Sequence, residues 1–472
     1  MGRQLPRMPQ RQDTTAARDA SPAPAIETDV LVIGGGPAGS TAATLLARKG
    51  WRVTLLEKAR HPRFHIGESL LPMNLPILER LGVLEQVRAI GVLKLGADFP
   101  RQDAADSTRA FRFDRALDAK YGYAFQVKRE QFDELLFRHA RCEGVDAREQ
   151  TAVERVEFEH GRPGIVHARG ADGQALAFRT RYLVDASGRD AFLGNTLKLK
   201  RKSGRHQSAA IFSHFKGVRR RDGEDAGNIT VDRFAHGWFW LIPLPGDVMS
   251  IGAVCFPEYL RQRSRGGDGD GDGETGNEAF LMRTLQSTSS VWSRMQGAER
   301  VAPVHVTGNY SYGCRRMSGP GWVMAGDAYA FIDPVFSSGV YLGMNSAEHA
   351  ARVVDGALRE PAREPALQRA MEKRLTRGLK HFSWFIHRFT TPVMQRLFAQ
   401  PRNGWQLEQA VISMLAGDVF DNRAVLRRLA LFRLVYAANA IAIAPRALRG
   451  WLARQRQVGQ RFAGDTLQGG NP

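Results

Sequence analysis

The segment TDVLVIGGGPAGSTAATLLARKGWRVTLLEK, residues 28–58, constrains the fold of this 472-residue chain more than any other. A β-branched run leads into a GxGxxG motif, an alanine-rich helix follows, and a second strand ends at Glu57. The first glycine permits a tight turn, the second lets a pyrophosphate approach the backbone, and the third lets the helix pack on the strand. The helix N-terminus stabilises phosphate charge, and an acid about 20 residues beyond the motif accepts a hydrogen bond from a ribose hydroxyl. The segment therefore predicts a dinucleotide site formed by Gly34, Gly36, Ala38, Gly39 and Glu57.

Two later strand-like runs also end in an acid, the second of them at Asp327, before a glycine-rich turn and a long helix. This order resembles the FAD-dependent monooxygenase superfamily over about residues 28–350. The resemblance implies that the dinucleotide is FAD, that the late aspartate binds its ribityl chain, and that backbone near 153 holds adenine. The alternative for Asp327 is a plain helix N-cap. The further FAD contacts implied by the resemblance are Arg129, Val153, Gly326 and Asp327.

Two short patterns narrow the resemblance to one branch. FHIGESLLP, residues 64–72, and WFWLIP, residues 238–243, are similar to motifs of the flavin-dependent halogenases of the phenol and pyrrole type. On a strand, period two places Trp238 and Trp240 on one face. In the family these tryptophans wall the passage between flavin and substrate. Both patterns also have plain structural interpretations, because Ser69 could cap the next helix and alternating tryptophans often line a core.

A lysine interrupts the mostly apolar run GVLKLGADF, residues 91–99. Lysine is almost never fully buried unless it is paired, so Lys94 either reaches water from the end of a strand or lies inside for chemistry. It stands 26 residues after Glu68, where the halogenases carry their essential lysine. In that family reduced FAD, O₂ and halide give hypohalous acid, which the lysine holds by a hydrogen bond or as a haloamine. Desolvation lowers the pKa of a lysine and makes either role feasible.

The stretch DPVFSSGVYLG, residues 333–343, supplies a halide site by the same resemblance. The N–H groups of Ser338 and Gly339 would form a small anion site at a helix N-terminus beside the flavin. The tryptophan halogenases carry a catalytic glutamate in this loop, whereas this chain has Phe336, a candidate wall of the substrate passage. The difference argues against free tryptophan and favours electron-rich phenols or pyrroles as substrates.

The chain is strongly basic, with a formal net charge of +19 and a pI near 10.4. Nucleic acid, an anionic membrane surface or an acidic protein could each exploit this field, and a general abundance of arginine would need no partner at all. No nucleic-acid fold signature accompanies the charge, so we expect no nucleic-acid partner. The three cysteines are scattered without metal spacing, which favours a reduced, cytoplasmic protein without a metal site. No run of about 18 apolar residues predicts a transmembrane helix.

The expected fold is α/β: an FAD-binding, Rossmann-like domain of the GR2 or p-hydroxybenzoate-hydroxylase type, an interleaved β-sheet substrate domain and a C-terminal helical subdomain. The expected boundaries are a disordered basic arm at 1–28, the FAD-binding domain at 29–350 with its substrate sheet at about 90–130 and 200–310, the basic helical subdomain at 351–460 and a tail at 461–472.

Together these features predict an FAD-dependent halogenase that acts on an electron-rich aromatic, free or bound to an acyl carrier protein, in secondary-metabolite or pigment biosynthesis. No second GxGxxG serves a nicotinamide, so we expect reduced FAD to come from a separate flavin reductase. The basic C-terminal helices could dock an acidic carrier protein or make peripheral contact with a membrane. Two alternatives stay open. One is a flavin-dependent aromatic hydroxylase or geranylgeranyl-reductase-like oxidoreductase without a halide requirement, and the other is a non-catalytic flavoprotein scaffold.

Overall fold

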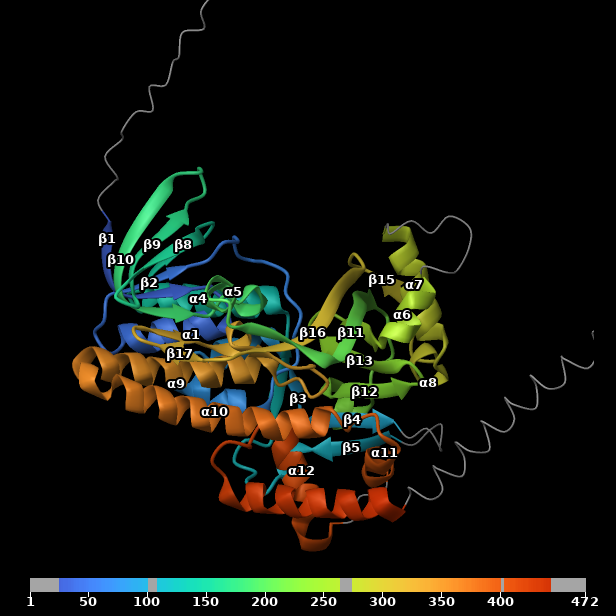
Figure 1. The fold of residues 1–472 in the computed structure, drawn as a ribbon. Coiled ribbons are helices and arrows are strands. Elements are labelled where there is room, and N and C mark those ends of the chain that lie inside the picture. Colours follow the sequence, from blue (N-terminus) through green and yellow to red (C-terminus); the bar gives the residue numbers. More distant parts are fainter. Residues whose placement is uncertain (1–24, 101–107, 264–273, 400–402, 443–472) are drawn as a thin grey trace, which may run out of the picture.

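The computed structural model describes residues 25–100, 108–263, 274–399 and 403–442 (Figure 1). Most of the predicted N-terminal arm, the predicted tail and the last part of the predicted helical region lie outside these residues. Within them, a largely parallel sheet with covering helices, a second and larger sheet, and a group of C-terminal helices are present. The predicted α/β fold class is therefore confirmed.

The predicted strand–helix–strand unit forms the centre of the first sheet. β1 (Ile26–Ile33) lies between β2 (Val53–Leu56) and β10 (Ala175–Asp185), parallel to both, and α1 (Pro37–Ala47) connects β1 to β2. The second half of β1, residues 30–33, is entirely apolar and buried because both faces of a parallel sheet are covered. The other strands of this sheet are β7 (Asp146–Arg148), β8 (Ala152–Glu159), β9 (Arg162–Arg169), β17 (Ser318–Gly319) and β18 (Trp322–Met324).

Helix α1 is buried along most of its length. It packs against α4 (Arg129–Cys142) and against α9 (Gly339–Arg359), and its small residues allow this close approach. The N-termini of α1 and α9, about 300 residues apart in the sequence, are thereby brought to the same part of the molecule. The shorter helices of this lobe are α2 (Leu75–Leu81), α3 (Leu84–Ile90) and α5 (Phe192–Thr196).

The second sheet presents one face to the first lobe and the other to a group of short helices (Figure 1). On β13, Trp238, Trp240 and Ile242 belong to the large core cluster shared with the first lobe, whereas Phe239 and Leu241 pack on the helix side. The strand order is β19 (Ala330–Phe331), β16 (His305–Cys314), β11 (Lys200–Lys216), β14 (Val248–Cys255), β13 (Gly237–Leu244), β12 (Ile229–Phe234), β4 (Gly96–Pro100) and β5 (Thr108–Arg112), and β15 (Glu299–Arg300) also pairs with β11. The covering helices are α6 (Pro257–Arg263), α7 (Glu274–Gln286) and α8 (Ser289–Trp292).

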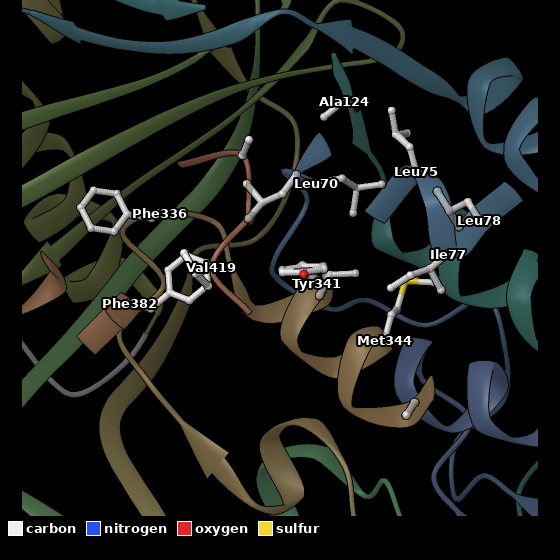
Figure 2. Close-up of a cluster of buried hydrophobic side chains, with 14 of the residues drawn as sticks. Leu70, Leu75, Ile77, Leu78, Ala124, Phe336, Tyr341, Met344, Phe382 and Val419 are labelled. Carbon is white, nitrogen blue, oxygen red and sulfur yellow. The ribbon is translucent and has the colours of Figure 1, made fainter. Parts of the chain in front are cut away.

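A two-stranded sheet and the C-terminal helices complete the fold. β3 (Gly91–Lys94) pairs with β6 (Ala124–Val127). The large core cluster includes Leu70, Phe336, Tyr341 of α9 and two side chains of the C-terminal region, Phe382 and Val419 (Figure 2). No described helix is long and apolar enough to cross a membrane. The C-terminal helices are α10 (Glu364–Ile386), α11 (Pro392–Ala399), α12 (Leu407–Leu415) and a last helix over 423–442.

Candidate active site

The glycine motif has the shape that a bound pyrophosphate requires. Gly34 adopts φ +99°, and a Cβ on Gly39 would lie 1.8 Å from the carbonyl oxygen of Gly34, so these two positions serve the turn and the helix packing. A Cβ on Gly36 would meet nothing closer than Arg63, at 3.5 Å, so this glycine faces open space. Helix α1 has no side-chain cap at its N-terminus, and its first N–H groups are left for a phosphate. The residues present therefore fit FAD.

Glu57 is fixed at the end of β2 by the backbone around it. Its two carboxylate oxygens accept hydrogen bonds from the N–H groups of Gly35, at 2.8 Å, and Ala59, at 2.9 Å. The backbone oxygen of Glu57 accepts a hydrogen bond from the N–H of Thr151, at 2.8 Å, and Val153 follows two residues later on β8. The predicted ribose and adenine contacts thus lie on adjacent segments.

The late aspartate is brought to the same place by small residues. A Cβ on Gly326 would lie 3.1 Å from Cα of Gly343 and 3.6 Å from Cβ of Ala38, so α1, α9 and the turn at 326–328 converge. Burial raises the pKa of Asp327 to about 6, against the opposing charges of Arg189 and Arg129. The N-cap position of α9 is held by Ser338, so the interpretation of Asp327 as a plain N-cap of that helix is wrong.

Arg129, in the first turn of α4, anchors the loop that contains Gly67, Glu68 and Ser69. Its guanidinium donates to both oxygens of Asp133, at 2.7 and 3.0 Å, and to the carbonyl of Ile66, at 2.8 Å. Burial alone would raise the pKa of Asp133, but the charge of Arg129 holds it below its usual value. The loop so anchored passes the first turn of α9, where a Cβ on Gly67 would lie 4.0 Å from the side chain of Val340.

The N-terminus of α9 can accept a small anion. Ser338 is fully buried, and its hydroxyl has no hydrogen-bond partner among the described residues. Ser337, just before it, adopts φ +56°, and a Cβ on Gly339 would meet no atom within 4 Å. The N–H groups of residues 338 and 339 precede the first helical hydrogen bond, so no intrahelical acceptor uses them. Donors, space and the helix dipole are all present for an anion.

Lys94 lies inside the protein. Its side chain is 1% exposed, and Nζ donates to Oγ of Ser69 and to the carbonyl of Leu70, both at 2.9 Å. Nζ also stands 5.3 Å from the ring centroid of Phe113. Burial lowers the pKa of Lys94 to about 7. The alternative in which this lysine reaches water is wrong, and so is the capping role for Ser69, because α2 begins only at Leu75.

Lys94 also lines a pocket that it shares with the loop before α9. The unfilled space in it, including the part open to solvent, is about 250 Å³. Its walls come from the 70s loop, β4, β12, the loop 335–337 and the end of α12, namely Leu71, Lys94, Ala97, Phe99, Phe113, Ile229, Val231, Val335, Phe336, Ser337 and Leu415. Lys94 and the predicted halide loop therefore face one apolar space.

Trp238 and Trp240 stand beside this cavity without lining it. Both are buried on β13, with ring centroids 5.9 Å apart, and Nε1 of Trp240 donates to Oγ of Ser250 at 3.1 Å. Trp240 pairs across the strands with Val231, a cavity residue. On its other side a Cβ on Gly252 would lie 2.3 Å from the indole, so only glycine leaves room for the ring.

Two features of the site were missed by the sequence analysis. The first is an aromatic cluster in which Phe389 contacts Phe336, at 5.4 Å between centroids, and Phe99, at 5.8 Å. Phe99 and Phe336 line the cavity, so this cluster links the cavity wall to the C-terminal region, and only the general apolar spacing of that region pointed to it. The second is a buried pair in which Nε2 of His214 donates to Oε1 of Glu68 at 2.8 Å. Glu68 stood in the quoted motif, but no pattern marked its partner 146 residues away.

Comparisons with known proteins agree with this geometry. The family described as FAD binding domain matches residues 27–384. A tryptophan 2-halogenase of Chondromyces crocatus is 38% identical over 69% of this chain, which spans 61% of that protein. The flavin-dependent halogenase gsfI of Penicillium aethiopicum is 33% identical over 75% of this chain and 69% of its own length. A 1H-pyrrole-2-carbonyl-[peptidyl-carrier protein] chlorinase of Pseudomonas fluorescens is 29% identical over 84% of this chain and 90% of the chlorinase.

Solved structures show the same fold. A flavoprotein/dehydrogenase of Cytophaga hutchinsonii superposes with a TM-score of 0.77 at 26% identity, covering 88% of this chain and 99% of that one. The myxobacterial chondrochloren halogenase CndH superposes with a TM-score of 0.71 at 30% identity, covering 86% of this chain and 96% of CndH.

Proposed function

The chain belongs to the FAD binding domain family and, within it, to the flavin-dependent halogenases, and on that basis we propose that it halogenates an electron-rich aromatic ring by way of Lys94. Reduced FAD, delivered by a separate flavin reductase, would supply the two electrons that reduce one oxygen atom of O₂ to water, and the other oxygen atom would oxidise halide to hypohalous acid. The glycine motif, Glu57 and Asp327 hold the cofactor, and the N-terminus of α9 holds the halide.

The observation that carries the proposal is the position of Lys94. A lysine that is 1% exposed lines the same cavity as residues 335–337. Because burial lowers its pKa to about 7, both the charged and the neutral amine are accessible near neutral pH. The charged form donates a hydrogen bond to hypohalous acid, and the neutral form attacks its halogen. The apolar walls exclude water, so the oxidant reaches the substrate rather than solvent.

Phe336 sets the class of substrate. It lies in the cavity wall where the tryptophan halogenases carry a glutamate, and no wall residue other than Lys94 is charged. A ring that reacts there must be activated by its own substituents, since the wall offers it no carboxylate base. Phenols and pyrroles meet this requirement. The pyrrole ring in the name of the Pseudomonas relative is bound to a carrier protein, which supports a carrier-bound substrate here.

An exposed row of cations on α10 is the proposed docking surface for that carrier. Arg369, Lys373, Arg377 and Lys380 are exposed at spacings of four, four and three residues, so they share one helix face. Carrier proteins present acidic surfaces, and complementary charge steers such encounters. Charge reversal at Arg377 and Lys380 should raise the KM of the carrier-bound aryl substrate and leave that of the free ring unchanged. Equal KM values would refute carrier docking, and co-sedimentation with anionic vesicles would assign the row to a membrane surface instead.

The experiment that tests the function uses the full chain with FAD, a flavin reductase, NADH, O₂, bromide and a phenol. Mass spectrometry should find a product with the bromine isotope pattern, and only when bromide is present. Lys94→Met should reduce that product at least about 100-fold while FAD remains bound, because the positioned acid or nucleophile is lost. Lys373→Met, which removes an exposed lysine, should leave the yield unchanged. A hydroxylated product formed without bromide would refute halogenation and support the aromatic hydroxylase.

A further inference from the structure

A buried carboxylate beside the site has half of its hydrogen-bonding capacity unfilled. Glu68 is 1% exposed, and its Oε1 accepts the hydrogen bond from His214, while Oε2 has no partner among the described residues. A desolvated carboxylate oxygen without a partner is costly to keep, so its presence calls for a functional explanation.

The neighbours of Glu68 in the sequence place it between the two ends of the site. Gly67 lies against Val340 in the first turn of α9, where the halide is expected. Ser69 accepts the hydrogen bond from Lys94. Glu68 is therefore flanked in the sequence by Gly67, which passes the expected halide site, and by Ser69, which accepts the hydrogen bond from Lys94.

His214 extends the pair toward solvent. Its side chain is 15% exposed. It lies on β11 two residues after Phe212, on the same face of the strand, and Phe212 contacts Trp240. Phe64, which is 41% exposed, stacks on His305 at 4.3 Å and contacts His214 from the outside. The pair thus runs from the protein surface to the interior on the active-site face of the second sheet.

The buried cations near the pair are already bonded to other carboxylates. Arg63 and Arg129 are balanced by Glu57 and Asp133, to which they are bonded. Glu68 adds a carboxylate with no cation in direct contact among the described residues. The nearby charged or titratable groups are Arg129, which also feels the charge of Asp327, and His305 beside His214. A halide at α9 would add a second negative charge to a poorly solvated region, which is unfavourable unless a proton accompanies it.

The proposed reaction itself consumes a proton. Reduced FAD (FADH₂), O₂, halide, the aromatic C–H and one H⁺ give FAD, the aromatic carbon–halogen bond and two waters. The two electrons from reduced FAD and the two from the aromatic C–H bond reduce O₂, and the halogen replaces the ring hydrogen. One proton per turnover must therefore come from solvent.

We propose that the Glu68–His214 pair takes up this proton from solvent when halide binds at the N-terminus of α9 and supplies it to the reaction. The imidazole gains the proton on its outer side and, as imidazolium, compensates the bound anion. Glu68 holds that charge through Oε1, and Oε2, which has no partner among the described residues, accepts and donates the proton in transit. The role rests on the proposed function, since it presupposes a halide site.

Calorimetric titration of bromide into the full-length, FAD-loaded protein tests the proposal without turnover. Titrations in buffers of different ionisation enthalpy should show that the wild type takes up about one proton per bromide. Wherever one proton is taken up, the bromide affinity should fall about 10-fold for each unit by which the pH rises. Glu68→Gln and His214→Gln should each abolish the uptake and make the affinity independent of pH. Affinity should rise in Glu68→Gln, because an anionic neighbour is removed, and fall in His214→Gln.

His236→Gln is the matched control. This exposed histidine lies in the turn between β12 and β13, stacked at 4.6 Å on Tyr259, which packs on the helix side of the sheet, and its loss should leave proton uptake intact. In turnover, His214→Ala should lower the halogenated product at least about 10-fold and regain it with added imidazole, which a purely structural role would not allow. Bromide binding with proton uptake unchanged in both pair variants overturns the proposal. A wild type that binds no bromide at all overturns the halide site and the proposed function with it.

Discussion

Replacing the buried lysine should make the protein more stable, in a pH-dependent way. In the unfolded chain Lys94 has its ordinary pKa of 10.5, and in the folded protein burial lowers it to about 7. Between these values the unfolded state binds a proton that the folded state does not. The free energy of unfolding therefore rises with pH from about 7 to 10.5, and the stability lost to this lysine is greatest below pH 7.

The size of the effect follows from the two pKa values. Linkage gives a cost of about 4 kcal/mol at pH 7 and about 2 kcal/mol at pH 9. Lys94→Met keeps the length of the side chain and removes this cost, but it also removes the hydrogen bonds to Ser69 and Leu70, worth about 1 kcal/mol each. The variant should be more stable than the wild type by about 2 kcal/mol at pH 7 and equally stable at pH 9.

Urea unfolding of the two proteins at pH 7, 8 and 9 measures the difference. Lys373→Met, at an exposed position on α10, should stay within about 0.5 kcal/mol of the wild type at each pH. A Lys94→Met protein that is less stable at pH 7, or whose difference from the wild type does not change with pH, would show that the amine is not desolvated as described.

Three further substitutions test other parts of the site. Gly39→Ala should abolish FAD binding measured by absorbance, since its Cβ would lie 1.8 Å from the carbonyl oxygen of Gly34 and force the motif apart; normal cofactor content would contradict the packing. Gly252→Val should displace the indole of Trp240, seen as changed tryptophan fluorescence, and an unchanged spectrum would show that the ring does not depend on this glycine. Phe389→Ala should lower stability by about 3–5 kcal/mol in urea unfolding and, by loosening Phe336 and Phe99, widen the range of aromatic rings accepted, whereas an unchanged substrate range would show that Phe389 does not shape the cavity.

The sequence predicted those parts of the fold that local chemistry determines. The glycine motif stands between a β-branched run and an alanine-rich segment, with a second apolar run ending in an acid after it, and β1, α1 and β2 formed as expected from this order. Period two on WFWLIP likewise put both tryptophans on one face. These features depend on neighbours in the chain, and a single sequence shows them.

The sequence could not decide features that depend on long-range packing. Whether Lys94 reached water or stayed inside depended on Phe113 and on residues 229–231, 335–337 and 415, which surround the amine only in the folded chain. The role of Ser69 was misjudged for the same reason, because capping and acceptance of a bond from Lys94 differ only in the path of the following residues. The pairing of Glu68 with His214, 146 residues apart, left no local pattern.

The desolvated amine is the central claim, and nuclear magnetic resonance of the full chain tests it most directly. With ¹³C-labelled lysine, the ε-carbon signal of Lys94, assigned by its loss in Lys94→Met, is followed from pH 5 to 11. We predict a midpoint of about 7, well below that of the exposed lysines. A midpoint near 10.5 would place the amine in water and contradict both its burial and the halogen-delivery role built on it.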